Sequence, residues 1–465
     1  MAPCFTRVPE VMVVESTARL PAFWDQNAAF VANLLGLFFD NKEEAKMLSD
    51  TVGEMDSYGG RLLPIVDLLY AGPERNLLVL EREPDPVLKR YFEEVAGLTL
   101  PEVAILPHRD YEQIGRQIRD QGVACHGLLE ILRDHPAGRM DGYVTDATLA
   151  GLAGLVGMRT FSTVAGSQSG NNKWMLYEHL KSQGLPTPHT EIAEGPGDVE
   201  RCLDSLRRAG YESAVVKAPM GASGIGLIKV PSLRGRGGGD PAVPAHFFTE
   251  GPCLIQGWIQ AGNLGVKSVR SPSVQLFLND DQVVIYDVTE QILSDESVHE
   301  GNESPPTYLA EHADGRGELF HQAGVAARWL HRRGYRGTAS VDFLWVERND
   351  GEFCVYVCEL NARVTGATYP CVLAHHYNPD GAWLLRNLRL DTPLLGGELM
   401  ELLHGSDCLW VPDGHRAGVF PVNFNTGDDG LVHKGQFLFL APSVSESKLL
   451  LETIMMNLPC LTDRD

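Results

Sequence analysis

The sequence lacks several features that would assign it to a special class. No two of its nine cysteines form a CxxC motif, and the sequence has no long apolar run. Scattered cysteines of odd number indicate reduced thiols, not a disulfide framework or a zinc site. The most apolar early stretch, residues 28–39, is interrupted by Asn33 and is too short to span a bilayer. With no basic and apolar leader at the start, we expect a cytoplasmic protein.

Basic charge is also scarce. The formal net charge is −22, which argues against a partner with a phosphate backbone and against an anionic membrane surface. We therefore expect neither nucleic acid nor membrane as a partner. A hydrophobic content of 44% and a charged content of 22% are typical of globular proteins, and 465 residues suffice for two to four domains.

The first third of the chain alternates between short apolar runs and amphipathic segments. Expected strands are residues 76–80, 103–106 and 141–145, and expected helices are residues 85–97, 111–120 and 147–155. Strands that alternate with helices predict a parallel sheet. We assign residues 1–165 to an N-terminal α/β domain.

The rest of the chain mixes helices with β-hairpins. Expected helices are residues 173–183, 199–209 and 319–333, and expected strands are residues 213–217, 273–278, 282–288, 339–347 and 352–360. Residues 234–244 are polar and glycine-rich, which indicates a surface excursion. Residues 393–465 are expected to form a small C-terminal domain, with strands at 418–423 and 435–440 and a helix at 445–456.

The first chemical signal is a lysine followed by a loop of small residues. Lys217 ends an expected strand, and Gly221, Ser223, Gly224 and Gly226 follow it. Small residues allow backbone N–H groups to approach phosphate oxygens, and the lysine supplies a point charge. The order differs from that of a P-loop, where the lysine follows the glycines. A glycine-rich hairpin with an exposed lysine would look the same, so this loop alone decides nothing.

The second signal is a hairpin rich in oxygen donors. Glu359, Asn361 and Arg363 alternate along one strand and so share a face, and Asp342 on the preceding strand can lie opposite them. Two carboxylates and an amide suit Mg²⁺ that also holds phosphates. Arg363 could hold a phosphate or a developing oxyanion. A salt-bridged sheet edge is the alternative, but the flanking apolar runs indicate burial, where carboxylates need a partner.

Together these motifs resemble the ATP-grasp superfamily over residues 165–390. The resemblance implies an α/β (α+β) ATP-grasp fold with a Rossmann-like N-terminal domain, and an ATP-grasp domain at 166–392 with a lid at about 190–258. It implies that Asp342, Glu359 and Asn361 bind Mg²⁺, or Mn²⁺ in its place. The residues implied to bind ATP are Lys173, Lys217, Gly221, Ser223, Gly224, Gly226, Gln256, Trp258 and Ile259. Residues 260–265 contain no carboxylate where this family often binds the ribose.

A narrower resemblance, to the pheganomycin-type peptide ligases, rests on the N-terminal α/β region, residues 271–278 and 289–302, and residues 422–436. It implies an ADP-forming ligase of specialised metabolism that joins an amino-acid-like carboxylate to an amino acid or peptide through an acyl phosphate. Lys217 and Arg363 would be catalytic, and a homodimer is compatible with the resemblance. The residues expected to face the substrate are Arg270, Glu290, Gln291, His299 and Asn302.

Two other functions remain open. A carboxylase-type ATP-grasp enzyme would make carboxyphosphate, although no lysine lies in a biotin-attachment context. A scaffold that binds ATP without turnover is the non-enzymatic alternative. The presence of both lysines, all three metal-ligand candidates and Arg363 favours an enzyme.

Overall fold

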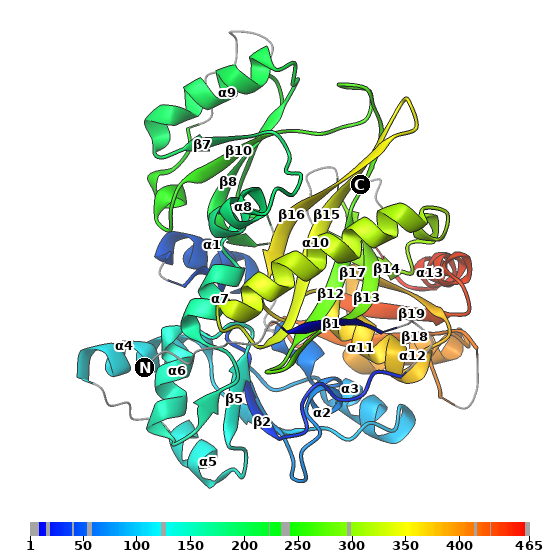
Figure 1. Cartoon of the computed structure of the whole chain (residues 1–465). Coiled ribbons are helices and arrows are strands. Elements are labelled where there is room, and N and C mark those ends of the chain that lie inside the picture. Colours follow the sequence, from blue (N-terminus) through cyan, green and yellow to red (C-terminus); the bar gives the residue numbers. More distant parts are fainter. Residues whose placement is uncertain are drawn as a thin grey trace.

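The computed structural model describes residues 9–14, 19–39, 41–53, 58–121, 127–222, 224–233, 242–294, 299–412, 416–427 and 429–460. Most of the predicted glycine-rich excursion, residues 234–241, therefore lies outside the described residues. Figure 1 shows the chain arranged around three sheets. The four-stranded sheet within the predicted lid, residues 190–258, stands above the rest of the molecule. Among the described helices, none combines the length and the apolar composition that crossing a bilayer requires.

The N-terminal sheet has the parallel strands that the alternation of elements predicts. Its strand order is β4-β3-β2-β5-β6, and every pair is parallel. The strands are β2 (Ala28–Val31), β3 (Leu77–Leu80), β4 (Glu102–Ile105), β5 (Arg139–Gly142) and β6 (Arg159–Thr160). The helices of this region are α1 (Lys42–Gly53), α2 (Val66–Leu69), α3 (Pro86–Arg90), α4 (His108–Gln121), α5 (Leu128–Asp134), α6 (Ala147–Leu155) and α7 (Val164–Gly170), with short turns η1 (Leu34–Phe38), η2 (Tyr58–Leu62) and η3 (Tyr91–Val95).

Two elements here differ from the sequence prediction. The central strand β2 lies in the apolar stretch 28–39, which we did not assign as a strand; all four of its residues are buried. The helix expected at 85–97 is divided into α3 and a π-helical turn, η3. Helix α3 begins where the sequence predicts, because Asp85 caps it: Asp85 Oδ1 accepts a hydrogen bond from the Val87 amide at 2.8 Å.

A second, four-stranded sheet lies within residues 190–258, the segment predicted to be a lid. Its order is β7-β10-β8-β9, with antiparallel pairs throughout. The strands are β7 (Thr190–Ala193), β8 (Ala214–Ala222), β9 (Ile225–Val230) and β10 (Cys253–Gly257); α9 (Val199–Arg208) packs on them, with η4 (Pro196–Asp198) and η5 (Ala245–Phe248). Helix α8 (Lys173–Ser182) precedes the lid and runs between it and the large sheet (Figure 1).

The third sheet is the largest, with ten strands. Its main path is β11-β15-β12-β13-β14-β17-β19-β18, with β16 beside β15 and β1 beside β13. The strands are β1 (Glu10–Val13), β11 (Val266–Arg270), β12 (Pro272–Leu278), β13 (Gln282–Leu293), β14 (His299–Ser304), β15 (Gly337–Arg348), β16 (Phe353–Asn361), β17 (Ala382–Leu394), β18 (Gly418–Thr426) and β19 (Val432–Ala441). The helices are α10 (Ala313–Arg332), α11 (Thr368–Tyr377), α12 (Gly396–Gly405) and α13 (Val444–Asn457), with the turn η6 (Thr307–Ala310).

The C-terminal strands continue this large sheet. β17 pairs with both β14 and β19, so β18 and β19 are hydrogen-bonded to it without a break. The C-terminal strands also pack on the N-terminal region. There the ring of Phe420 on β18 stacks on that of Phe92, with centroids 5.5 Å apart. The domain boundaries drawn from sequence at 165 and 393 stay predictions, but the apolar core crosses both of them.

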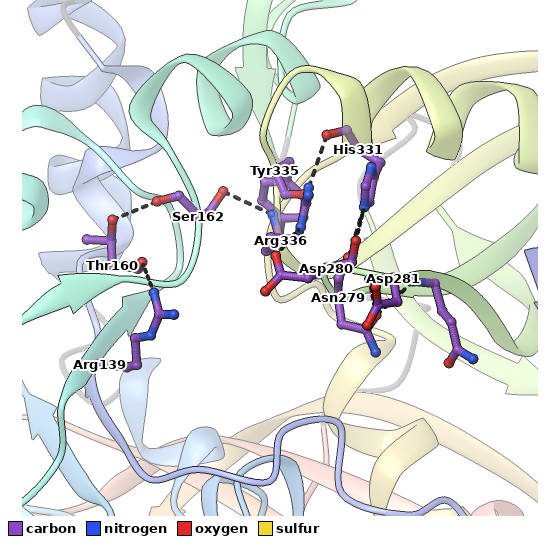
Figure 2. Close-up of polar contacts among 10 residues, drawn as sticks. Arg139, Thr160, Ser162, Asn279, Asp280, Asp281, His331, Tyr335 and Arg336 are labelled. Atoms are coloured by element: carbon purple, nitrogen blue, oxygen red, sulfur yellow. Dashed lines mark hydrogen bonds and ion pairs between the residues drawn. The ribbon is translucent and has the colours of Figure 1, made fainter. Parts of the chain in front are cut away.

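A polar network joins the N-terminal sheet to the large sheet. The Arg336 amide donates to Ser162 Oγ at 3.2 Å, and Arg336 Nε donates to Asp280 Oδ1 at 3.0 Å in the β12–β13 turn. His331, at the end of α10, contacts the Asn279 carbonyl oxygen through Nε2 at 3.0 Å. Figure 2 shows these side chains converging between β6, α10 and the turn. The network joins the N-terminal region to the β12–β13 turn of the large sheet.

Candidate active site

The β15–β16 hairpin carries the predicted cluster of oxygen donors. Asp342 and Glu359 are directly opposite each other across the two strands. Asn361 Nδ2 donates to Asp342 Oδ2 at 2.9 Å and to Glu359 Oε1 at 3.4 Å. Ser273 Oγ on β12 donates to Asp342 Oδ1 at 2.6 Å. The three candidate metal ligands therefore form one cluster, as the alternation along β16 predicts.

Both predicted lysines reach this cluster from other elements. Lys173, at the start of α8, lies with Nζ 3.1 Å from Glu359 Oε2 and also donates to the Gly221 carbonyl oxygen at 3.2 Å. Lys217, on β8, is only 8% exposed, and its Nζ lies 3.4 Å from Cys358 Sγ on β16. Two lysines far apart in sequence thus meet one hairpin in the space between the lid and the large sheet.

The electrostatics of the cluster differ between its two carboxylates. Burial alone would raise the pKa of Glu359, but Lys173, Arg363 and Lys217 outweigh it and lower that pKa to about 2. Burial, and then the neighbouring Glu359 carboxylate, raise the pKa of Asp342 to about 6. A further cation beside both carboxylates would stabilise the ionised forms of Asp342 and Glu359. The pair is therefore a suitable place for a divalent metal ion.

Arg363 follows the hairpin and turns toward the same cluster. Its Nη1 donates to Asn171 Oδ1, and Asn171 Nδ2 in turn donates to the Ala362 carbonyl oxygen at 3.1 Å. Burial lowers the pKa of Arg363, while Glu359 and Asp342 oppose that effect. A buried guanidinium held by an amide is placed to bind an anionic group of a substrate.

The glycine loop lies at the turn between β8 and β9. Gly224 and Gly226 have positive φ of 83° and 77°, which side chains with a Cβ rarely adopt. A Cβ on Gly221 would lie 2.6 Å from the Ile225 carbonyl oxygen, so the two limbs of the loop approach closely. Ser223, the fourth predicted loop residue, lies outside the described residues. The described glycines have the close backbone approach that phosphate binding needs.

Three of the residues implied to bind ATP, Gln256, Trp258 and Ile259, lie at or just after the end of β10. Gln256 is buried and donates through Nε2 to Thr190 Oγ1 at 3.0 Å. Trp258 and Ile259 line a hollow between the end of the lid and the β15–β16 hairpin, and the Lys229 Nζ lies 4.5 Å from the centre of the Trp258 ring. Gln260 and Asn263, from the segment without carboxylates, line the same hollow. They are polar groups available there to a ribose.

Three of the five predicted substrate residues lie on the face of the sheet that carries the cluster. The Gln291 side chain hydrogen-bonds to Asp342. Asn302 Nδ2 donates to Thr289 Oγ1 at 3.2 Å, and His299 Nε2 lies 2.5 Å from Asn302 Oδ1. These contacts connect the metal-ligand candidates to β14.

Arg270 and Glu290 lie elsewhere, which corrects the expectation that they face the substrate. Glu290 accepts from the Ser271 amide at 2.7 Å and from the Tyr308 hydroxyl at 2.8 Å. The Arg270 guanidinium lies 4.3 Å from the centre of the Tyr308 ring. Side chains alternate along β13, so Glu290 and Gln291 point to opposite faces. Arg270 and Glu290 thus belong to a structural cluster on the other face.

Sequence analysis missed Glu44, which lies near the lysines. It is 0% exposed, and both of its carboxylate oxygens lack a hydrogen-bond partner among the described residues. Burial raises its pKa to about 7, and the Glu250 carboxylate adds to that effect while Lys173 opposes it. A Cβ on Gly226 would lie 3.1 Å from Glu44 Oε1. Helix α1 looks like an ordinary amphipathic helix in the sequence, and only the tertiary contact reveals this residue.

The cluster fits Mg²⁺ better than a metal that needs a full protein cage. Among the described residues, no group of three or more His, Cys, Asp or Glu side chains is close enough to hold a metal ion. Mg²⁺ commonly takes only one or two carboxylates and completes its shell with waters and phosphate oxygens. Asp342 and Glu359, with the Asn361 amide, satisfy that requirement on facing strands.

Comparison with known proteins agrees with this geometry. Residues 170–367 match the family model of the ATP-grasp domain. A curated relative is the butirosin acyl-carrier protein–L-glutamate ligase of Niallia circulans, 31% identical over 204 residues, which are 43% of this chain and 44% of that ligase. The match thus spans less than half the length of this relative.

Solved structures extend the likeness to the whole fold. A biotin carboxylase from Campylobacter jejuni superposes with a TM-score of 0.55 at 13% identity, covering 94% of this chain and 92% of that one. N5-carboxyaminoimidazole ribonucleotide synthetase from Thermus thermophilus gives a TM-score of 0.53 at 12% identity, covering 93% and 99%. The chain has the ATP-grasp fold. Its residues 170–367 match the ATP-grasp domain model, and a stretch of 204 residues is similar in sequence to a protein named as an L-glutamate ligase.

Proposed function

We propose that this protein is an ADP-forming ligase that activates a carboxylate as an acyl phosphate and joins it to the amine of an amino acid or peptide. The observation that carries the proposal is the meeting of Lys173 and Glu359 at 3.1 Å, with Lys217 and Arg363 acting on the same carboxylate. The similarity to a glutamate ligase supports an amino-acid substrate, since that relative is named for ligation to L-glutamate.

Each residue has a role in this chemistry. Asp342, Glu359 and Asn361 are the residues that would hold Mg²⁺, and the ion would supply positive charge to neutralise the phosphate oxygens. Lys173 and Lys217 bind phosphate oxygens of ATP, and the glycine loop covers them. Arg363 holds the substrate carboxylate and later stabilises the oxyanion that forms when the unprotonated amine attacks and phosphate leaves. Exclusion of water by the lid protects the acyl phosphate from hydrolysis.

A carboxylase-type reaction is the second candidate, because the carboxylase and carboxyaminoimidazole synthetase structures have the same fold. At 12–13% identity that likeness carries fold only. The two reactions differ in their co-substrate. One consumes bicarbonate, and the other needs an organic acid together with an amine.

The test is ADP release measured across an array of amino acids and short peptides, with and without added bicarbonate, and with products identified by mass spectrometry. We expect ADP release that depends on an added amine. We also expect a product whose mass equals that of the acid plus the amine, less one water. Dependence on bicarbonate alone would favour the carboxylase. ATP binding without ADP release under every condition would leave a scaffold and refute the proposal.

A further inference from the structure

A band of polar side chains runs across β12, β13 and β14 of the large sheet, away from the metal-ligand cluster. From Asp342 it passes to Ser273 on β12, and Thr289 on β13 lies opposite Ser273. Thr289 accepts from Asn302 on β14, which contacts His299. A sheet face that packs against a protein core is normally apolar, so a polar band of this length needs another explanation.

Leu385 on β17, opposite Asn302, interrupts the band, and polar side chains follow again on the same face of the C-terminal strands. Asn387 on β17 lies opposite Gln436 on β19, and Gln436 Nε2 donates to Asn387 Oδ1 at 3.0 Å. Gln436 Nε2 also donates to the Tyr369 hydroxyl at 3.1 Å. Gln436 is buried, yet its Oε1 has no partner among the described residues. A buried amide oxygen without a donor is costly unless a ligand or water supplies one.

Cations gather where the band ends. Arg61 on η2 is 4% exposed and donates through Nε to the Tyr143 hydroxyl and through Nη1 to the Tyr369 hydroxyl, both at 3.3 Å. Lys434 lies two residues from Gln436 on β19, so their side chains share a face, and Arg389 lies opposite Lys434. Burial lowers the pKa of Lys434 to about 8, and Arg389 and Arg61 add to that effect.

A nearby acid offsets only part of this positive charge. Burial raises the pKa of Glu81, and the hydrogen bond from the Gly59 amide to Oε1 at 2.7 Å and the charge of Arg61 only partly oppose that effect. Burial lowers the pKa of His299, the hydrogen bond with Asn302 opposes that effect, and Arg61 and Lys434 add to it. Cations held together in a partly buried place repel one another, and an anion between them relieves both the repulsion and the desolvation. In a chain of net charge −22, such a local excess is informative.

We propose that Arg61 and Lys434 form a carboxylate-binding subsite for the far end of the acceptor, with the polar band as the track between this subsite and the reacting amine. The assignment of the ligand as an acceptor rests on the proposed function. Five inter-strand steps separate β15 from β19, about 24 Å at about 4.8 Å each. An extended peptide of about seven residues covers that distance, whereas a single amino acid does not.

The subsite therefore predicts a preference for peptides that end in a free carboxylate. The test is calorimetric binding, without ATP, of alanine-based peptides of two to eight residues, each made as the free acid and as the C-terminal amide. We expect the acid to bind at least about tenfold more tightly than the amide for the longer peptides, since hydrogen bonds to charged groups are the stronger ones.

Variants locate the effect. Lys434→Gln should abolish the preference for the acid, and Lys434→Glu should reverse it toward the amide. Lys448→Gln removes one positive charge from an ion pair with Glu303 outside the proposed subsite and should leave the preference unchanged. Arg61→Lys tests the other half of the subsite, and Lys434, which is only half-buried, keeps the test valid if that variant does not fold.

Two outcomes overturn the subsite: no preference for the acid in the wild type, whether both forms bind or neither does, or a preference that survives in Lys434→Gln. Failure of the proposed function is a separate result. It would show as an absence of amine-dependent ADP release while the acid preference remains. Loss of the preference with ADP release intact would refute the subsite alone.

Discussion

Glu44 offers a test of the electrostatics around the lysines. The side chain is fully buried on α1, its oxygens lack hydrogen-bond partners among the described residues, and burial raises its pKa to about 7. Replacement by Gln removes the ionisable group and keeps the shape of the side chain. Because the fully buried carboxyl must ionise at high pH, we expect Glu44→Gln to stabilise the ATP-free protein there.

The sign and size follow from the difference between the folded and unfolded pKa values. In the unfolded chain the carboxyl titrates near 4.5, and in the folded protein it titrates near 7. Below pH 4.5 it is protonated in both states, so it has no effect on stability. As the pH rises from 4.5 to about 7, the Glu44 carboxyl loses its proton in the unfolded chain but keeps it in the folded protein. The free energy of unfolding therefore falls over this pH range. At about 1.36 kcal/mol for each pKa unit, the full effect is about 3 kcal/mol above pH 7.

The assay is urea unfolding of the ATP-free protein at pH 5 and at pH 8. Glu44→Gln should raise the free energy of unfolding by about 1 kcal/mol at pH 5 and about 3 kcal/mol at pH 8. Glu43→Gln is the matched control, because Glu43 is exposed on the same helix and its loss changes the net charge equally. If Glu44→Gln gave the same change at both pH values, or destabilised the protein at pH 8, the buried carboxyl would not be the cause.

The remaining predictions concern catalysis. Glu359→Gln should lower the rate of ADP formation by more than about 100-fold, because loss of a supporting group around a metal already costs about 10–100-fold. The control is Glu352→Gln, since Glu352 is exposed on the same hairpin. A wild-type rate in Glu359→Gln would exclude Glu359 from the metal site. Lys217→Ala should raise the Kd for ATP by about 10–100-fold in a calorimetric titration, the value of a charged hydrogen bond; unchanged affinity would contradict its contact with phosphate. Deletion of residues 234–239 should leave the rate of ADP formation largely intact, and complete inactivity would show that the segment takes part.

Much of the local structure could be predicted from the pattern of residues. The alternation in β12, β13, β15 and β16 predicted two hairpins, and the structure confirms both. The parallel N-terminal sheet followed from strands that alternate with helices, although β2 was missed because its four buried residues continue into further apolar residues and turns. A short apolar run carries no period that separates a strand from other buried structure.

The site divides in the same way. The sequence by itself determined which side chains of β16 share a face, since alternation along a strand is a local property, and so Glu359 and Asn361 were predicted together. It also determined that Lys217 precedes a loop of small residues. Only the tertiary structure decided that Lys173 meets Glu359, that Glu44 is buried beside the glycine loop, and that Glu290 points away from the site while Gln291 points into it. Those contacts join elements far apart in the chain, and their geometry depends on how sheets and helices pack, which no local spacing of residues encodes.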